Sequence, residues 1–317
     1  MFLGKGEIVM HKLRSFFYKN KYKIFKILGI LIFIIILIQL LNFFAGRDNN
    51  VSNIKQNITE LNEDNKGLVS DKSAVTGQSI EKETLKNSTD IINEFMTYCN
   101  QHDIEKAYSL LTDECKNEMY RNVNSFEQSY YKNVFNGEKR NYTIENWVGD
   151  IYRVNITGDL LATGKNDNGY SKQDYITIKE VDNEYKLNIN NYIGYSKIDK
   201  ITADDNISVE VISKNTYKDY EEYTIKVTNK TNDIMQLDNI SNTKTLYLED
   251  SNENQYSYYN HELTTSILTV QSGQTKELTI KFYNTYISTK NIEYMVFSNI
   301  ILKNGQLSEK IEFKANV

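Results

Sequence analysis

Proline is absent from the 317 residues, and cysteine occurs only at Cys99 and Cys115. The chain is instead rich in Lys, Asn, Ile and Tyr, the usage of an AT-rich genome such as that of a low-GC Gram-positive bacterium. Its many tyrosines are therefore weak evidence of function by themselves. No stretch resembles a phosphate-binding loop or a serine-hydrolase elbow. The sequence therefore gives no sign of the two classes of enzyme that these motifs mark.

Charge is absent from residues 27–46, which read ILGILIFIIILIQLLNFFAG. A helix of about 20 residues rises about 30 Å, the thickness of the hydrocarbon core of a bilayer, and a helix that is apolar on every side favours lipid over water. We therefore predict a single transmembrane helix. Its apolar run is longer than a usual signal-peptide core, and Phe43-Phe44-Ala45 is a poor cleavage site, so we expect an uncleaved signal anchor. No cysteine follows the run closely, which excludes a bacterial lipoprotein.

Residues 1–26 carry seven basic residues and one acid, a net charge of +6 against −5 for the whole chain, so −11 is left after the span. Basic residues that precede a first transmembrane helix stay in the cytoplasm. We predict a plasma-membrane protein with a cytoplasmic tail over 1–26 and extracytoplasmic C-terminal domains. The negative charge of those domains disfavours nucleic acid as a partner.

Residues 47–86 contain no aromatic residue, six basic residues and seven acids, which predicts a flexible tether. Val51, Ile54, Ile58 and Leu61 are nevertheless spaced as in a coiled coil. Two readings stay open: a short stalk that forms a homodimer, or an amphipathic turn that arises by chance.

An α+β domain is expected over residues 88–198. Cap-type residues at Ser88-Thr89-Asp90, Asp103 and Asn124-Ser125 each precede apolar residues at helical spacing. After Asn136-Gly137 the apolar period changes to two, as in half-buried strands. The predicted strands contain Tyr142-Ile144, Tyr152-Val154-Ile156, Tyr175-Ile176-Ile178 and Tyr185-Leu187-Ile189, with a turn at Asn166-Asp167-Asn168-Gly169. Two or three helices followed by a four-stranded antiparallel sheet form an α+β cone.

The run from Ile92 through Asn100-Gln101-His102-Asp103 to Ala107-Tyr108-Ser109-Leu110-Leu111-Thr112 resembles the opening helices of the nuclear-transport-factor-2-like superfamily (NTF2-like). Its bacterial extracytoplasmic members often carry a similar N-x-x-D-x-x-x-A-Y-x-L-L-T phrase. Enzymes of this superfamily place acid–base groups, commonly Asp and His, inside the cone. Here His102 falls in a turn between helices, and the strands offer no evident inward Asp/His pair. The resemblance implies a non-catalytic member, with no catalytic residue and no cofactor.

Residues 200–317 alternate apolar and polar residues in short segments, which predicts an all-β sandwich. The expected strands contain Ile207-Val209-Val211, Tyr223-Ile225-Val227, Leu246-Tyr247-Leu248, Leu263 to Val270, Leu278-Ile280-Phe282, Tyr294-Val296-Phe297 and Ile311-Phe313. The order resembles an immunoglobulin-like extracellular domain of unknown function found in anchored proteins of Gram-positive bacteria. The matching residues are Thr224 to Asn229, Leu248 to Tyr256 and Val270 to Thr275. Ser272-Gly273 replaces the usual Pro-Gly of that domain, which loosens the turn assignment.

The two cysteines are expected to be free and buried. Cys99 lies about three residues before the turn near residue 102, and Cys115 lies about thirteen after it. In a helical hairpin this offset is roughly 15 Å, whereas a disulfide needs Cα atoms within about 7 Å.

Two acidic motifs suggest metal binding only weakly, so no metal site is predicted. Residues 250–254 (Asp-Ser-Asn-Glu-Asn) begin like a calcium loop, but Gln255 and His261 stand where that loop needs Gly and Glu. A polar hairpin is the preferred reading. His261-Glu262 lacks the second histidine of a zinc-protease helix.

Two tyrosine-dense segments are candidate partner-binding surfaces: Tyr217, Tyr220 and Tyr223, and Tyr256, Tyr258 and Tyr259. Exposed together, these rings could stack on sugars or anchor a protein. The alternative is that they reflect genome bias and the strand preference of tyrosine.

Taken together, the sequence predicts a non-catalytic, membrane-anchored binding or scaffold protein of the cell envelope, with a protein or cell-wall partner. NTF2-like cones also occur in conjugative transfer channels, so a component of a transfer apparatus is a specific alternative. A small-ligand receptor or an enzyme that uses the cone cavity is the alternative of a different class.

Overall fold

The computed structural model describes Tyr22 and residues 67–158, 170–238, 245–304 and 307–317. The chain divides into residues 1–60 and residues 61–317, and every element below belongs to the second unit. The expected span over 27–46 and the coiled-coil positions Val51, Ile54, Ile58 and Leu61 lie outside the described residues, as does the turn at 166–169. Within the part of the chain that is described, no helix is both long enough and apolar enough to cross a membrane.

Residues 67–80 are packed on the first sheet, so the prediction of a tether is wrong from residue 67 onward. Leu68 forms a parallel bridge with Ile144 and is only 9% exposed. The amide of Val69 donates to the carbonyl of Ile144 at 2.9 Å, and the Ser73 hydroxyl donates to the carbonyl of Trp147 at 2.7 Å. Ile144 and Trp147 lie on an edge strand, whose free backbone groups recruit this segment. Composition alone does not reveal such an edge.

Helix α2 (Lys82–Asn100) begins six residues before the expected cap at Ser88. Ser88 and Thr89 are buried inside the helix, where the Thr89 hydroxyl donates to the carbonyl of Leu85 at 2.9 Å. The predicted apolar face is confirmed, since Ile92, Phe95, Met96 and Cys99 are fully buried.

The predicted cap of the second helix is confirmed: the Asp103 side chain accepts from the amide of Lys106 at the start of α3 (Ile104–Ser109). Helix α4 (Asp113–Met119), which was not predicted, is capped by Thr112. The cap of the third predicted helix is Asn122, two residues before the expected Asn124, and Asn122 and Ser125 form a capping box. It comprises α5 (Val123–Phe126), the π-helical turn η2 (Glu127–Tyr131) and α6 (Lys132–Val134).

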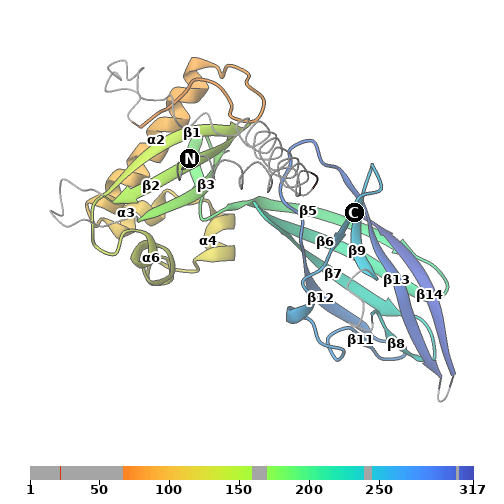
Figure 1. Cartoon of the computed structure of the whole chain (residues 1–317). Coiled ribbons are helices and arrows are strands. Elements are labelled where there is room, and N and C mark those ends of the chain that lie inside the picture. Colours follow the sequence, from red (N-terminus) through yellow and green to blue (C-terminus); the bar gives the residue numbers. More distant parts are fainter. Residues whose placement is uncertain (1–21, 23–66, 159–169, 239–244, 305–306) are drawn as a thin grey trace, which may run out of the picture. The chain divides into compact units, whose positions relative to one another are not determined.

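The four strands of the first sheet follow these helices and are all antiparallel, in the order β1-β2-β3-β4 (Figure 1). They are β1 (Arg140–Val148), β2 (Ile151–Gly158), β3 (Ser171–Val181) and β4 (Glu184–Asn188). Helical residues such as Phe95 and Phe126 share one core with strand residues such as Ile144 and Val154. This part of the chain is therefore an α+β layer with its helices packed on one sheet.

Strand β5 (Tyr192–Ala203) crosses the expected boundary at residues 198–200. Its first residue, Tyr192, is buried in the core of the α+β part, and the strand then pairs with β6 (Ile207–Tyr217). Irregularities in register occur at Tyr192/Gly194 and at Lys197/Lys200. One strand therefore belongs to both folded parts.

The remaining strands form a β-sandwich. One sheet has the order β12-β7-β6-β5, and the other has the order β10-β9-β13-β8-β11 with β14 paired to β13. Their bounds are β7 (Glu221–Asn229), β8 (Ile234–Gln236), β9 (Leu246–Asp250), β10 (Gln255–Ser257), β11 (Thr269–Val270), β12 (Thr275–Phe282), β13 (Ile292–Asn304) and β14 (Leu307–Asn316). Apolar residues of both sheets form a single core. The mostly β character of the chain and the sandwich are as predicted.

The strand expected from Leu263 to Val270 is wrong for most of its length. The 3-10 helix η3 (Asn260–Glu262) precedes it, and only Thr269–Val270 forms a strand. The amide of Leu268 donates to the carbonyl of Thr264 at 3.1 Å, and the Thr269 hydroxyl donates to the carbonyl of Thr265 at 2.7 Å. These local threonine-rich turns compete with strand pairing.

Candidate functional site

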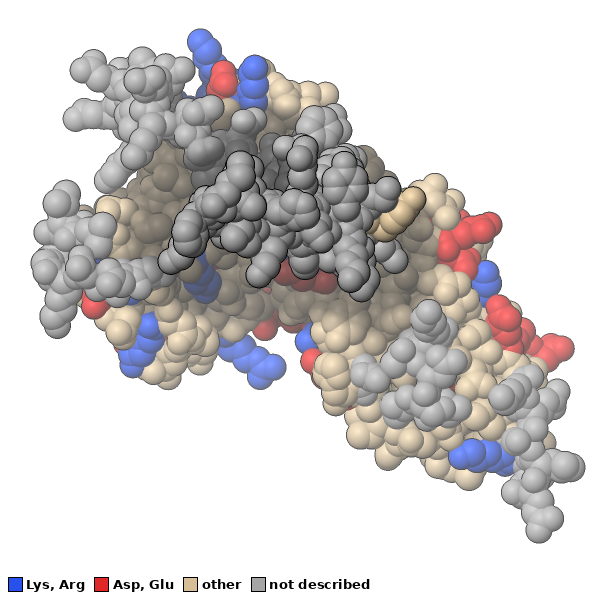
Figure 2. All heavy atoms as spheres, in the orientation of Figure 1, with Lys and Arg blue, Asp and Glu red and all other residues tan. Residues whose placement is uncertain are grey.

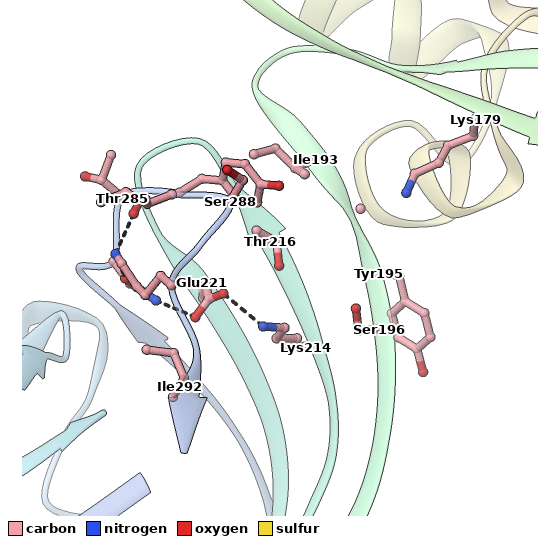
Figure 3. Close-up of a pocket in the computed structure, with 15 residues that line it drawn as sticks. Lys179, Ile193, Tyr195, Ser196, Lys214, Thr216, Glu221, Thr285, Ser288 and Ile292 are labelled. Carbon is pink, nitrogen blue, oxygen red and sulfur yellow. Dashed lines mark hydrogen bonds and ion pairs between the residues drawn. The ribbon is translucent and has the colours of Figure 1, made fainter. Parts of the chain in front are cut away.

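A pocket of about 220 Å³, which we call the β5 pocket, is lined by strands β3, β5, β6 and β7, by the segment between β12 and β13, and by the first residue of β13 (Figure 3). The side chains that carry charge in its lining are Lys179, Lys214, Glu221 and Lys290. No sequence motif had marked it, because its residues come from separate elements that are far apart in the chain.

Glu221 is the centre of the polar contacts in the β5 pocket. It is 6% exposed and occupies an inward-facing position of β7, where the residues at every second position are buried. One carboxylate oxygen, Oε1, accepts from Lys214 Nζ at 3.1 Å. The other, Oε2, accepts from the Tyr223 hydroxyl at 2.9 Å and from Asn284 Nδ2 at 2.6 Å. Three donors therefore compensate a buried carboxylate.

Lys290 contributes a second charged group, which is half-buried. Its ammonium donates to Asn284 Oδ1 and to the carbonyl of Thr285, and lies 4.3 Å from the ring centre of Tyr256. Burial lowers the pKa of Lys290 from its ordinary value of 10.5, although the carboxylates of Glu221 and Asp250 act in the opposite direction. The ammonium of Lys290 is therefore only partly exposed to water.

Lys179 reaches the β5 pocket from β3. A Cβ atom at Gly194 would lie 3.4 Å from Lys179 Nζ and 3.2 Å from Glu114 Oε1, so the glycine lets the backbone of β5 pass close to both groups. Glu114 is held by Asn188 Nδ2 at 2.6 Å and by the amide of Tyr195 at 3.2 Å.

The six tyrosines predicted as a partner-binding surface do not lie together on the surface. Tyr223 and Tyr258 are fully buried and Tyr217 is 5% exposed, whereas Tyr220, Tyr256 and Tyr259 are half-buried. The buried hydroxyls are used internally: Tyr217 donates to Glu118 at 2.7 Å and Tyr258 donates to Asp238 at 2.9 Å. Alternation along the strands turns half of each segment into the core.

A smaller group of rings does gather near the surface. Tyr220 stacks on Tyr217 with ring centres 4.2 Å apart and meets Tyr259 at 6.1 Å. Tyr259 in turn stacks on Tyr283, which is 47% exposed and was not predicted. The ammonium of Lys281 lies 4.7 Å from the ring centre of Tyr220. Tyr283 directly follows the buried Phe282 of β12. Because side chains alternate along a strand, this position was the signal that Tyr283 faces outward.

The core of the α+β part holds a carboxylate that sequence reasoning missed. Asp174 of β3 is fully buried; its Oδ2 accepts from the Tyr130 hydroxyl at 2.8 Å and its Oδ1 accepts from the amide of Asn191 at 3.0 Å. Burial raises the pKa of Asp174 and outweighs the opposing effects of these bonds and of Lys172. His102, by contrast, lies in the interhelix turn as expected, where its Nδ1 contacts the Tyr131 hydroxyl.

Aromatic rings fill the core around Asp174. Phe126 stacks on Tyr130 with ring centres 5.6 Å apart and meets Tyr120 edge-on at 5.5 Å. Phe95 contacts both Phe126 and Tyr130, at 6.3 and 6.1 Å. Tyr130 therefore meets Asp174 inside a closely packed aromatic cluster.

Cys99 and Cys115 are both buried free thiols in the described part of the chain, as predicted. Burial raises the pKa of each thiol, that of Cys115 to about 12. Thiolate chemistry at neutral pH is therefore disfavoured at both positions.

The acidic motif at residues 250–254 forms a turn between β9 and β10, in agreement with the preferred reading. Asp250 Oδ1 accepts from the amides of Asn252 and Asn254 at 2.9 and 3.0 Å, and Oδ2 accepts from the Tyr256 hydroxyl at 2.8 Å. His261 is exposed in η3. Within the described ranges no cluster of three or more His, Cys, Asp or Glu side chains is arranged to hold a metal.

Asp250 is expected to make the free energy of unfolding depend on pH in the acidic range. Burial by itself would raise its pKa, but the bonds donated by Asn254, Tyr256 and Asn252 outweigh it and lower the pKa from 3.8 to about 2. The unfolded chain therefore binds a proton at Asp250 more tightly than the folded chain does. The contribution of ionised Asp250 to the free energy of unfolding is complete above about pH 4 and is lost as the pH falls toward 2. We expect Asp250→Asn to flatten this acid limb in urea unfolding of the purified chain between pH 2 and 5. Asp219→Asn, at an exposed site paired with Lys218, is the control; equal acid limbs in wild type and Asp250→Asn would contradict the assignment.

Acidic and basic side chains are interspersed on the face shown in Figure 2. The described surface on this side therefore presents mixed charge.

Comparison with known proteins gives little guidance. No known family matches the chain, and no curated protein sequence matches it. A solved structure described as a conserved hypothetical protein from Bacillus anthracis aligns with 37% of this chain and 95% of its own length, at 13% identity and a TM-score of 0.23. At that score the alignment supports no structural argument, so the function rests on the site geometry.

Proposed function

We propose that this protein is a non-catalytic, membrane-anchored binding protein of the cell envelope, whose two folded parts lie outside the membrane and hold a protein or cell-wall partner. The observation that carries the binding role is the packing of the α+β part. In NTF2-like enzymes the chemistry takes place in the cone interior, and here Phe95, Phe126 and Tyr130 pack that region. Polar groups collect instead in the β5 pocket, at the strand that both parts share.

The proposal includes a fold family for each of the two folded parts. Helices packed on a four-stranded antiparallel sheet support an NTF2-like cone, and two sheets around one core support an immunoglobulin-like sandwich. The apolar run over 27–46 and the basic residues that precede it support the anchor and its orientation.

Topology and partner can be tested in one experiment on cells that produce the full chain. Protease added to protoplasts should remove residues 67–317 and spare a reporter fused before residue 1. Crosslinking on intact cells should then capture a protein or wall fragment. Protection of the folded parts in intact protoplasts would refute the topology, and turnover of a substrate by the purified chain would refute the non-catalytic role.

An enzyme or small-ligand receptor that uses the cone is the second candidate, and Asp174 favours it. A buried carboxylate with a raised pKa, bonded to a tyrosine, is a common feature of acid–base sites. A role in a conjugative transfer apparatus remains the specific alternative within the binding class, and the genes that flank this one would decide it. Homodimerisation through Val51, Ile54, Ile58 and Leu61 is proposed from their spacing, and the same crosslinking experiment would detect it.

A further inference from the structure

We propose that the β5 pocket binds a small ligand through an oxyanion, either a phosphate or a carboxylate group. This inference deepens the proposed binding function by assigning it a site and a ligand chemistry. It rests on the balance of charge in the pocket, on an unused hydrogen-bond donor and on the size of the cavity.

Positive charge exceeds negative charge in the lining. Three lysines, Lys179, Lys214 and Lys290, face one carboxylate, Glu221. Glu221 forms its ion pair with Lys214 and is further held by Asn284. Among the described residues, Lys179 and Lys290 have no carboxylate within ion-pair distance.

Of these two, Lys179 is the more available. Among the described residues it lies within 4.0 Å of no carboxylate oxygen. Glu114, the acid close to it, is held by Asn188 and by the amide of Tyr195. Lys290 is fixed by Asn284 Oδ1 and by the carbonyl of Thr285, and burial lowers its pKa. An oxyanion bound at Lys179 would therefore gain a charge-assisted hydrogen bond.

Hydroxyl groups complete the lining. Thr216 of β6 is 7% exposed, and among the described residues its hydroxyl has no hydrogen-bond partner. Figure 3 shows this hydroxyl pointing toward the Glu221–Lys214 pair. Ser196 and Ser288 add two more hydroxyls to the lining. A hydroxyl that has no partner in the protein is available to a ligand or to water.

The dimensions of the pocket limit the ligand. A volume of about 220 Å³ admits a phosphate or carboxylate group with a small attached moiety, but not a folded protein segment. A polymer or protein partner would therefore insert one charged group while the rest of it stays on the surface.

The test is titration of the full chain in detergent, by calorimetry at constant ionic strength, with inorganic phosphate, acetate and chloride in parallel. We expect phosphate or acetate to bind more tightly than chloride, and the tighter of the two identifies the source of the oxyanion. Lys179→Gln should weaken that binding about tenfold, since it removes a charge-assisted hydrogen bond. Thr216→Val, which keeps the shape of the side chain, should weaken it by a smaller factor.

Lys186→Gln is the matched control. Lys186 lies directly opposite Lys179 on β4, pairs with Glu184 at 3.0 Å and is outside the lining of the β5 pocket. Equal binding of all three anions, or equal losses in Lys179→Gln and Lys186→Gln, would overturn the proposal. Partner capture on cells could still succeed in that case, so failure of the pocket and failure of the proposed function are distinguishable.

Discussion

Glu221→Ala is expected to lower the free energy of unfolding by about 3 kcal/mol, because removal of one partner from a buried, hydrogen-bonded ion pair strands the other. The carboxylate accepts from Lys214, Tyr223 and Asn284, and all three would lose their acceptor at once. Tyr223 is fully buried and Asn284 is 1% exposed, so water cannot easily take the place of the carboxylate. Chemical denaturation of the purified chain measures the change.

Two further variants separate burial from charge. Glu221→Gln keeps the volume and part of the hydrogen bonding, so we expect a smaller loss of about 1 kcal/mol. Glu277→Ala removes a carboxylate that pairs with Lys226 at 3.8 Å and is 60% exposed, and should change stability by less than about 0.5 kcal/mol. Similar losses in Glu221→Ala and Glu277→Ala would show that the contacts of Glu221 are not the source of stability.

The spacing of apolar residues and the helix-capping residues predicted many of the helices and strands. The two-residue period of Ile207-Val209-Val211 and of Tyr223-Ile225-Val227 reflects strands with one face in the core, and both lie in strands as expected. Asp103 was identified as a cap because its side chain can replace a missing partner of the first helical amides. These signals are local, so one sequence is enough to read them.

Elements that depend on distant partners were missed. Residues 195–200 of β5 are mostly exposed and show no apolar alternation; pairing with β6 is what makes them a strand. Residues 67–80 are ordered because β1 offers an unpaired edge. Neither cause can be read from the composition of the segment itself.

Part of the candidate site could have been predicted from the sequence. Glu221 stands two residues before Tyr223 in an alternating run, so the period could have placed this carboxylate on the core face, although Glu221 was not predicted. Lys179 and Lys290, however, reach the pocket from β3 and from the segment before β13, more than a hundred residues apart in the chain. Asp174 was hidden because β3 is buried over five consecutive residues, so no alternation marked its direction.

Asp174→Ala should lower the free energy of unfolding by about 3 kcal/mol, through a cavity and through the loss of an acceptor for Tyr130 and Asn191. Asp174→Asn should behave differently, since an amide keeps the volume and carries no charge. The raised pKa means that the folded chain binds this proton more tightly than the unfolded chain, so wild type loses stability as the pH rises from 3.8 toward the folded pKa. Asp174→Asn has no carboxyl group to ionise, so its stability does not fall in this way. Its free energy of unfolding in urea, relative to that of wild type, should rise as the pH increases above 3.8.

Asp174→Asn also decides between the proposed function and its rival. In a binding protein Asp174 acts only through packing, so Asp174→Asn should capture the same partner on cells as wild type. In an enzyme that uses the cone, the carboxylate would exchange a proton with a substrate, and Asp174→Asn would abolish turnover while leaving the fold intact. Because Tyr130 and Phe126 pack around the carboxylate, a substrate could reach it only if the aromatic cluster opened. Amide exchange of η2 that is no faster than that of the neighbouring sheet would argue against such opening.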